Sequence, residues 1–180
     1  MRQAVTAEEP GTFELVNVEP DDLDPGDVRI RVEATGICGS DLHWVHAPER
    51  WQPGRVIGHE FAGEIIELGS LVKGWSVGER VAVMPGRMCG TCPNCHAGRY
   101  QLCDRLSDLF GLTVPGGLSE SLNLPPQALF RLPETVSYAL GAMTEPLAVA
   151  VHGFRLAARL DPDRPTSGAR VVVLGAGIIG

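Results

Sequence analysis

Hydrophobic and polar positions alternate along the first third of the chain, with the two-residue period of half-buried β-strands. The clearest stretch begins at Val28, where Val28, Ile30 and Val32 alternate with Arg29 and Arg31. Glycine and proline turns separate several such stretches, so the pattern predicts a mainly β, barrel-like domain. The expected strands are Gln3–Thr6, Thr12–Val18, Val28–Thr35, Phe61–Leu68, Arg80–Met84, Leu118–Leu124 and Leu129–Leu132.

Helical periodicity appears in two places. The segment Ser40–His46 follows a glycine and predicts a short helix or turn. From Ser137 onwards, apolar residues recur at helical spacing, and Pro146 stands where a second helix would begin, a position that tolerates proline. The chain therefore predicts some α-structure after the β-domain.

The last residues combine an apolar run with a glycine motif. After a polar linker at Asp161–Gly168, the run Val171–Leu174 is typical of a buried parallel strand, and it leads into a Gly-x-Gly-x-x-Gly string. A strand followed by this string predicts the start of a dinucleotide-binding unit, the alternative being a plain glycine turn. The helix that would seat the phosphates is not in the sequence, so we do not expect this chain to hold a nucleotide alone. The motif glycines are Gly175, Gly177 and Gly180.

Composition narrows the function classes. Of 180 residues, 44% are hydrophobic, which is enough for a core, and the net charge of −7 disfavours a nucleic-acid partner. No apolar run is long enough to span a membrane, and no signal core follows Met1. We therefore expect a cytoplasmic protein that binds neither nucleic acid nor a membrane.

Four of the five cysteines fall within one short segment, Cys89, Cys92, Cys95 and Cys103. Their spacing, with Gly90 permitting a tight backbone, predicts a closed tetrahedral zinc site that stabilises a lobe and has no open position for a substrate. A disulfide pair and an iron–sulfur cluster are the alternatives. The fifth cysteine, Cys38, needs a separate explanation.

Several further motifs occur in one order: Cys38-Gly39-Ser40-Asp41-Leu42-His43, Gly58-His59-Glu60, the four-cysteine segment, Gly78-Glu79-Arg80-Val81, Gly117-Leu118-Ser119-Glu120, Glu145-Pro146 and the final glycine string. In this order and spacing the chain resembles the zinc-dependent medium-chain dehydrogenases. The resemblance implies a GroES-like, partly open β-barrel with the four-cysteine zinc lobe at 88–106, over residues 1–145. A connecting helix and linker at 146–168 and the start of a Rossmann domain at 169–180 would follow.

The resemblance also implies a second, catalytic zinc bound by Cys38 and His59. Taken alone, Cys38 is as readily a buried thiol, and His59 a histidine whose hydrogen bonds are satisfied within the core. The liver-type alcohol dehydrogenases have a cysteine where this chain has Glu145, so the chain is more similar to the polyol, sorbitol, threonine and butanediol dehydrogenases. There Glu145 or Glu60 would complete the site; otherwise each is a carboxylate in an ion pair or at a helix start.

The implied chemistry assigns roles to three neighbouring residues. Zinc lowers the pKa of a substrate hydroxyl, which then releases hydride to NAD or NADP. Ser40 and His43 would relay the proton to solvent, and Asp41 would hold His59 in one tautomer. Asp41 is alternatively a charge at a helix N-terminus.

We thus expect a zinc-dependent oxidoreductase for a secondary alcohol or polyol, homo-oligomeric in its parent form, with the 180-residue chain inactive alone. The alternative is a non-enzymatic zinc-binding module that presents the lobe to a protein partner. A zinc count separates the two hypotheses.

Overall fold

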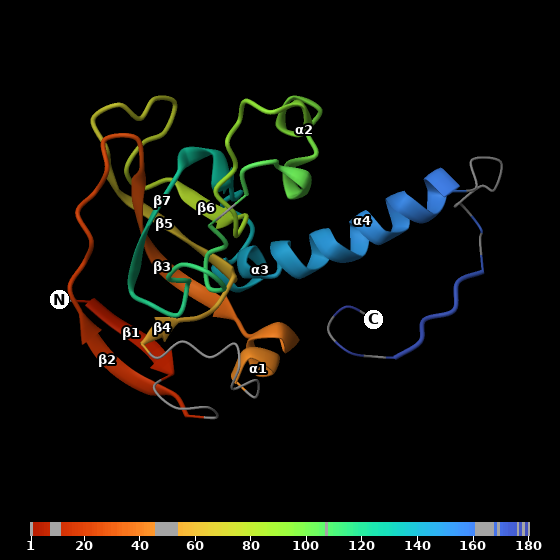
Figure 1. Cartoon of the computed structure of the whole chain (residues 1–180), viewed down its shortest axis with the longest axis horizontal. Helices are drawn as coiled ribbons and strands as arrows, with labels where there is room; N and C mark the ends of the chain where they lie inside the picture. Colours follow the sequence, from red (N-terminus) through yellow and green to blue (C-terminus); the bar gives the residue numbers. More distant parts are fainter. Residues whose placement is uncertain are drawn as a thin grey trace.

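Two antiparallel β-sheets form the body of the protein (Figure 1) in a computed structural model, which describes residues 2–7, 12–45, 54–106, 108–160, 168, 170–175, 177 and 179. The strands are β1 (Arg2–Ala7), β2 (Glu14–Val18), β3 (Val28–Gly36), β4 (Arg55–Val56), β5 (Glu60–Leu68), β6 (Arg80–Val83), β7 (Ser121–Leu124) and β8 (Leu129–Arg131). The helices are α1 (Gly39–Val45), α2 (Pro93–His96), α3 (Tyr138–Ala142) and α4 (Thr144–Leu160), with 3-10 turns η2 (Tyr100–Leu102) and η3 (Pro126–Ala128).

The sheets have the strand orders β2-β1-β4 and β7-β3-β5-β6-β8. In the described residues neither sheet closes on itself, so the predicted mainly β, partly open architecture is confirmed. Side chains from the five-stranded sheet and the loops over it form the main core: Val28, Ile30, Phe61, Ile65, Val81, Val83, Phe110, Leu122, Leu124, Ala128 and Leu129.

The predicted alternation of β3 holds where the strand enters the sheet. Val28 and Ile30 are fully buried, whereas Arg31 is exposed. The register of β3 against β5 then shifts between Val32 and Ala34, which marks a bulge. A bulge bends its strand and breaks the two-residue period, and the end of β3 is accordingly only half-buried.

The ends of most predicted strands lie within two residues of the observed ends. One predicted strand is shorter in the structure, and one observed strand was not predicted. The predicted strand at Leu118–Leu124 shortens to β7 because Leu118 hydrogen-bonds elsewhere: its N–H donates to the carbonyl of Ile57 at 3.0 Å, and its carbonyl accepts from Val5 at 2.8 Å. The two-residue strand β4 was not predicted, because it has too few positions to show a period. His46, the last residue of the predicted short helix, lies outside the described residues.

The predicted strand Val171–Leu174 is wrong for this structure. These residues have no regular secondary structure, and Val172 and Leu174 are 83% and 94% exposed. A parallel strand is stable only where neighbouring strands satisfy its backbone and helices cover both faces. Neither surrounds this run in the described part of the chain.

Helix α4 projects away from the two sheets (Figure 1). Its apolar residues have the predicted helical spacing, but Leu147, Val151 and Phe154 remain exposed. Among the described residues no helix has the length and apolar character that crossing a membrane requires.

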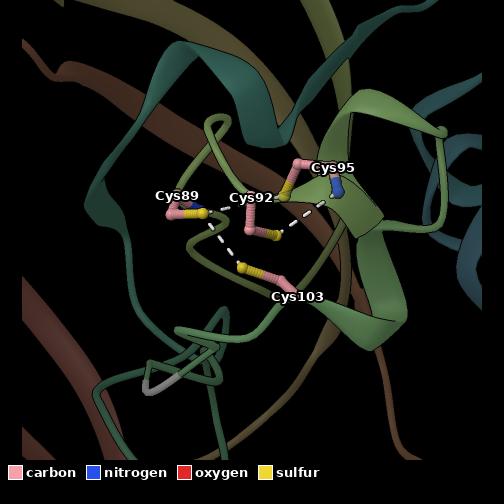
Figure 2. Close-up of side chains that lie close together, drawn as sticks. All are labelled: Cys89, Cys92, Cys95 and Cys103. Atoms are coloured by element: carbon pink, nitrogen blue, oxygen red, sulfur yellow. Dashed lines mark hydrogen bonds between the residues drawn. The ribbon is translucent and has the colours of Figure 1, made fainter.

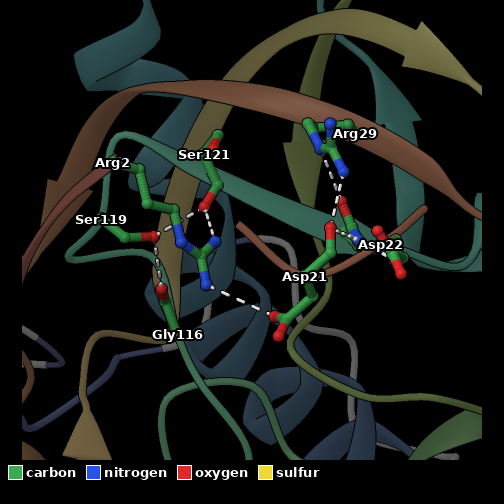
Figure 3. A network of polar contacts seen from close by, with 8 residues as sticks. Arg2, Asp21, Asp22, Arg29, Gly116, Ser119 and Ser121 are labelled. Carbon is green, nitrogen blue, oxygen red and sulfur yellow. Dashed lines mark hydrogen bonds and ion pairs between the residues drawn. The ribbon is translucent and has the colours of Figure 1, made fainter. Parts of the chain in front are cut away.

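A buried arginine joins the two sheets (Figure 3). The guanidinium of Arg2 on β1 donates to the backbone carbonyl of Ser121 on β7 and to the carboxylate of Asp21 at 3.5 Å. Ser119 pairs with Ala4 as an isolated bridge, and its hydroxyl donates to Gly116 and Ser121 carbonyls at 3.2 and 2.9 Å. These contacts tie β1 to the segment that leads into β7.

Candidate metal centres

Four cysteine side chains converge in the lobe between β6 and β7 (Figure 2). Their sulfurs all lie within 4.8 Å of one another, and those of Cys89 and Cys95 are 3.9 Å apart. Tetrahedral zinc, with Zn–S bonds of about 2.3 Å, would hold its sulfurs about 3.8 Å apart. A disulfide needs about 2.05 Å, and all four cysteines are free. The geometry therefore fits one tetrahedral metal ion.

Backbone amides in the lobe are aimed at sulfur. The N–H of Cys89 donates to Cys103 Sγ, and the N–H of Cys95 to Cys92 Sγ, each at 3.4 Å. The second contact caps α2, where Pro93 occupies the first turn. Donors of this kind stabilise thiolates, the form that binds metal.

The thiols respond unequally to this environment. Hydrogen bonds from Thr91 lower the pKa of Cys89 to about 6, and a backbone N–H at Asp104 is the largest cause of the lowered pKa of Cys92. Burial, reinforced by Cys92, raises the pKa of Cys95 to about 12. The metal-free cluster thus favours a mixture of thiol and thiolate, which a dication would convert to four thiolates. Sequence reasoning missed Thr91, which acts through its backbone and its side chain, and Asp104, which acts through its backbone, because neither belongs to the cysteine spacing pattern.

A second set of donors is assembled by the pairing of β3 with β5. Gly36, at the end of β3, lies opposite Glu60, at the start of β5. Cys38, just beyond the end of β3, therefore lies beside His59, which immediately precedes β5. The thiol of Cys38, a ring nitrogen of His59 and a carboxylate oxygen of Glu60 lie within 4.8 Å of one another. The structure thus brings together three residues that the sequence proposed as ligands.

Asp41 and Ser40, both on α1, flank the imidazole of His59. The carboxylate of Asp41 is 1% exposed and accepts the backbone N–H of Cys38 at 2.9 Å. Its other oxygen lies 3.3 Å from Nδ1 of His59, close enough for an ion pair but not aligned as a hydrogen bond. The hydroxyl of Ser40 lies 3.2 Å from Nε2. Burial lowers the pKa of His59, but Asp41 and Cys38 more than offset it and raise that pKa to about 9.

The Glu60 carboxylate is the least satisfied group near this set. The residue is 1% exposed, and neither carboxylate oxygen has a hydrogen-bond partner within the protein. A buried carboxylate without partners is costly, and a bound cation would remove that cost. The donor set of Cys38, His59 and Glu60 therefore fits a zinc ion with an open position, as three protein ligands allow.

Glu145 lies near this set without belonging to the same close group. Burial raises its pKa, the charge of His59 lowers it, and that of Glu60 raises it, so the three side chains interact electrostatically. Glu145 also lines a cavity of about 540 Å³ between β6, the cysteine lobe and α4, whose wall is otherwise largely apolar, as at Met84 and Val149. Whether Glu60 or Glu145 is the third ligand stays a prediction.

The remaining predicted site residues lie apart from these donors. His43 is exposed one turn along α1 from Ser40. Gly175, with φ of +95°, and Gly177 are described, but a Cβ added to either would contact nothing within 4 Å, so neither is packed into a nucleotide-binding turn. Gly180 lies outside the described residues.

Comparison with known proteins identifies the family to which this architecture belongs. A family model described as the alcohol dehydrogenase GroES-like domain matches residues 24–134. Sorbitol dehydrogenase of Arabidopsis thaliana is 44% identical over 160 residues, covering 87% of this chain and 42% of the relative. The chain spans less than half the length of the curated relatives it matches.

Two solved structures agree with these matches. Galactitol-1-phosphate dehydrogenase from Escherichia coli aligns with a TM-score of 0.78 and 32% identity, over 86% of this chain and 45% of that one. A protein of Sinorhizobium meliloti 1021, described as a zinc-binding dehydrogenase and solved with NADP, aligns with a TM-score of 0.75 and 38% identity, over 87% and 45%. Through its GroES-like domain, the chain belongs to the zinc-dependent medium-chain dehydrogenase family.

Proposed function

We propose that this chain is the metal-binding catalytic part of an NAD- or NADP-dependent dehydrogenase that oxidises a secondary alcohol or polyol. The observation that carries the proposal is the convergence of Cys38, His59 and Glu60 donors within 4.8 Å, separate from the closed cysteine lobe. Three protein donors leave a coordination position for substrate, whereas four cysteines leave none. A chain with only a structural role would have no need for the second set, formed by Cys38, His59 and Glu60.

The residues around His59 have distinct tasks in this proposal. Asp41 keeps the imidazole in one orientation, because its carboxylate bridges the Cys38 backbone and Nδ1 of His59. A bound zinc ion would supply Lewis-acid chemistry that lowers the pKa of a substrate hydroxyl. The hydroxyl of Ser40 would accept the released proton while giving up its own, and His43, exposed on the same helix, would take that second proton and pass it to solvent.

The cavity beside Glu145 supports the placement of substrate and nicotinamide. Its wall is largely apolar, which suits the carbon chain of a substrate and the ring of a nicotinamide. Glu145 lines this cavity and also interacts electrostatically with His59 and Glu60. We infer that the hydroxyl of an alcohol in this cavity lies on the Glu145 side, the side of the lining that interacts with the donor set.

The named relatives support the substrate and cofactor classes. One acts as a sorbitol dehydrogenase by name, another as a galactitol-1-phosphate dehydrogenase, and a third was solved with NADP. We infer a hydroxyl on a sugar-derived or similar carbon chain as the group oxidised, with a nicotinamide as hydride acceptor. Because Gly175 and Gly177 are unpacked, we do not expect hydride transfer from this chain alone.

Metal stoichiometry tests the proposal directly. We expect about two zinc ions per chain by elemental analysis, and about one in Cys38→Ser with the fold retained, because the lobe and the second set are independent. In the cobalt-substituted protein, sorbitol should change the visible spectrum of the wild type but not that of Cys38→Ser. One zinc ion in both proteins, with no response to sorbitol, would instead favour the interaction module.

A further inference from the structure

The residue opposite Glu60 is a glycine, and the space where its side chain would lie is occupied by the side chain of Glu60. Gly36 pairs with Glu60 across the β3–β5 ladder. A Cβ built on Gly36 would lie 2.3 Å from Oε2 of Glu60, and its next nearest atoms, at 3.1 and 3.3 Å, also belong to the Glu60 side chain.

Other glycines of the domain show that this contact is specific. A Cβ on Gly63, also at the β3–β5 pair, would lie 2.1 Å from the backbone carbonyl of Arg31, so that glycine serves strand packing. A Cβ on Gly39, next to Cys38, would have nothing within 4 Å. Gly36 differs from both, because the neighbour it accommodates is a carboxylate near the metal donors.

We propose that Gly36 is a positioning residue that holds the Glu60 carboxylate against Cys38 and His59. The inference rests on the proposed catalytic metal site. Glu60 is 1% exposed, so a methyl group at position 36 cannot push the carboxylate into water. It has to displace the carboxylate within the site. The closest atom, Oε2, is the far end of the side chain and has to move furthest, whereas Cβ and Cδ of Glu60 have to yield by only a few tenths of an ångström. We therefore expect the strand pairing of β3 to survive while the donor geometry changes.

The test compares Gly36→Ala with Gly39→Ala, a matched control that adds the same methyl group where there is space. We expect Gly36→Ala to weaken cobalt or zinc binding at the second set by about 10- to 100-fold, the usual effect of disturbing the groups that orient ligands. Its cobalt absorption bands should shift, whereas Gly39→Ala should match the wild type. Circular dichroism and a urea transition establish that each variant is folded.

A double variant shows whether Gly36 acts through Glu60. In a Glu60→Ala background the methyl group no longer meets a carboxylate, so Gly36→Ala should cause no further loss of metal affinity. If Gly36→Ala alone fails to fold, recovery of the fold in Gly36→Ala/Glu60→Ala supports the same contact, and failure to recover it refutes the contact.

Two results overturn the inference: Gly36→Ala binds metal like Gly39→Ala, or it weakens the Glu60→Ala protein as much as the wild type. A wild-type chain that binds metal only at the cysteine lobe would refute the proposed function itself. The two failures are therefore distinguished by the wild-type stoichiometry.

Discussion

The two donor sets of this domain are built in opposite ways. The lobe takes four sulfurs from one short segment, and its own backbone amides stabilise them. The second set takes a sulfur, a nitrogen and an oxygen from Cys38, His59 and Glu60, which meet only because β3 pairs with β5. One set is determined by local sequence, and the other by the register of a sheet.

The difference has a physical consequence for what each set can do. Four thiolates close a tetrahedron around a metal and contribute folding energy to a segment that otherwise has a small core. In the lobe that core is Met88 with the cysteines and their few apolar neighbours. The second set lies against the main sheet, whose core consists of apolar side chains. We therefore expect the fold to tolerate mixed ligands and incomplete coordination at this set. The lobe has no position for a substrate, whereas the second set would have one.

Loss of metal from the lobe should have the largest effect on structure. In Cys95→Ala we expect the segment 88–106 to become sensitive to protease, because structural zinc contributes about 10 kcal/mol or more in small zinc domains. Limited proteolysis with mass spectrometry locates the cuts. Cys38→Ala is the control, since it removes one ligand of the second set and should leave the lobe resistant. An unchanged cleavage pattern in Cys95→Ala would show that the lobe does not depend on its metal.

The sequence predicts features built from one segment better than features built by the pairing of distant segments. The cysteine lobe was predicted from its spacing alone, because all its ligands are neighbours in the chain. Strands with a clear period were also predicted, such as Val28–Thr35, which the structure shows as β3 (Val28–Gly36). The wrong strand at Val171–Leu174 had the right composition, but its stability depends on neighbours that composition does not supply.

The second donor set was beyond sequence reasoning in one respect. Family resemblance pointed to Cys38 and His59, but the residues alone could not distinguish Glu60 from Glu145. The β3–β5 register brings Glu60 close to Cys38 and His59, whereas Glu145, on α4, lies beside a cavity, and which of the two is the third ligand stays a prediction. The space that Gly36 leaves depends on the same register.

The junction between the lobe and the sheet offers a second, smaller effect. Arg87 precedes the lobe, and its guanidinium makes two hydrogen bonds, of 3.1 and 2.8 Å, to the buried carboxylate of Asp27 at the start of β3. Arg87→Ala leaves that carboxylate unpaired. Breaking a fully buried pair costs about 3–5 kcal/mol, and because Arg87 is 38% exposed we expect a loss of about 2 kcal/mol.

Urea unfolding of the zinc-loaded protein measures this loss, and Arg31→Ala is the matched control. Arg31 also binds carboxylates, of Glu33 and Glu64, but its side chain is 51% exposed, so its removal should cost clearly less stability than that of Arg87. Equal losses in the two variants would show that the junction is no stronger than an ordinary surface ion pair.

The smallest effect that we expect comes from the group that orients His59. Asp41→Asn keeps an acceptor for the backbone N–H of Cys38, but its amide nitrogen then faces Nδ1 of His59 and favours the opposite tautomer. Metal affinity at the second set should fall by about tenfold, the lower end for such orienting groups, while the lobe keeps its metal. Competition with a zinc-binding dye gives both affinities in one titration. Ser40→Ala is the control, because it removes a neighbour of Nε2 without changing the orienting carboxylate. If Asp41→Asn binds as tightly as Ser40→Ala and the wild type, the carboxylate only caps α1, and the orientation of His59 comes from packing against the sheet.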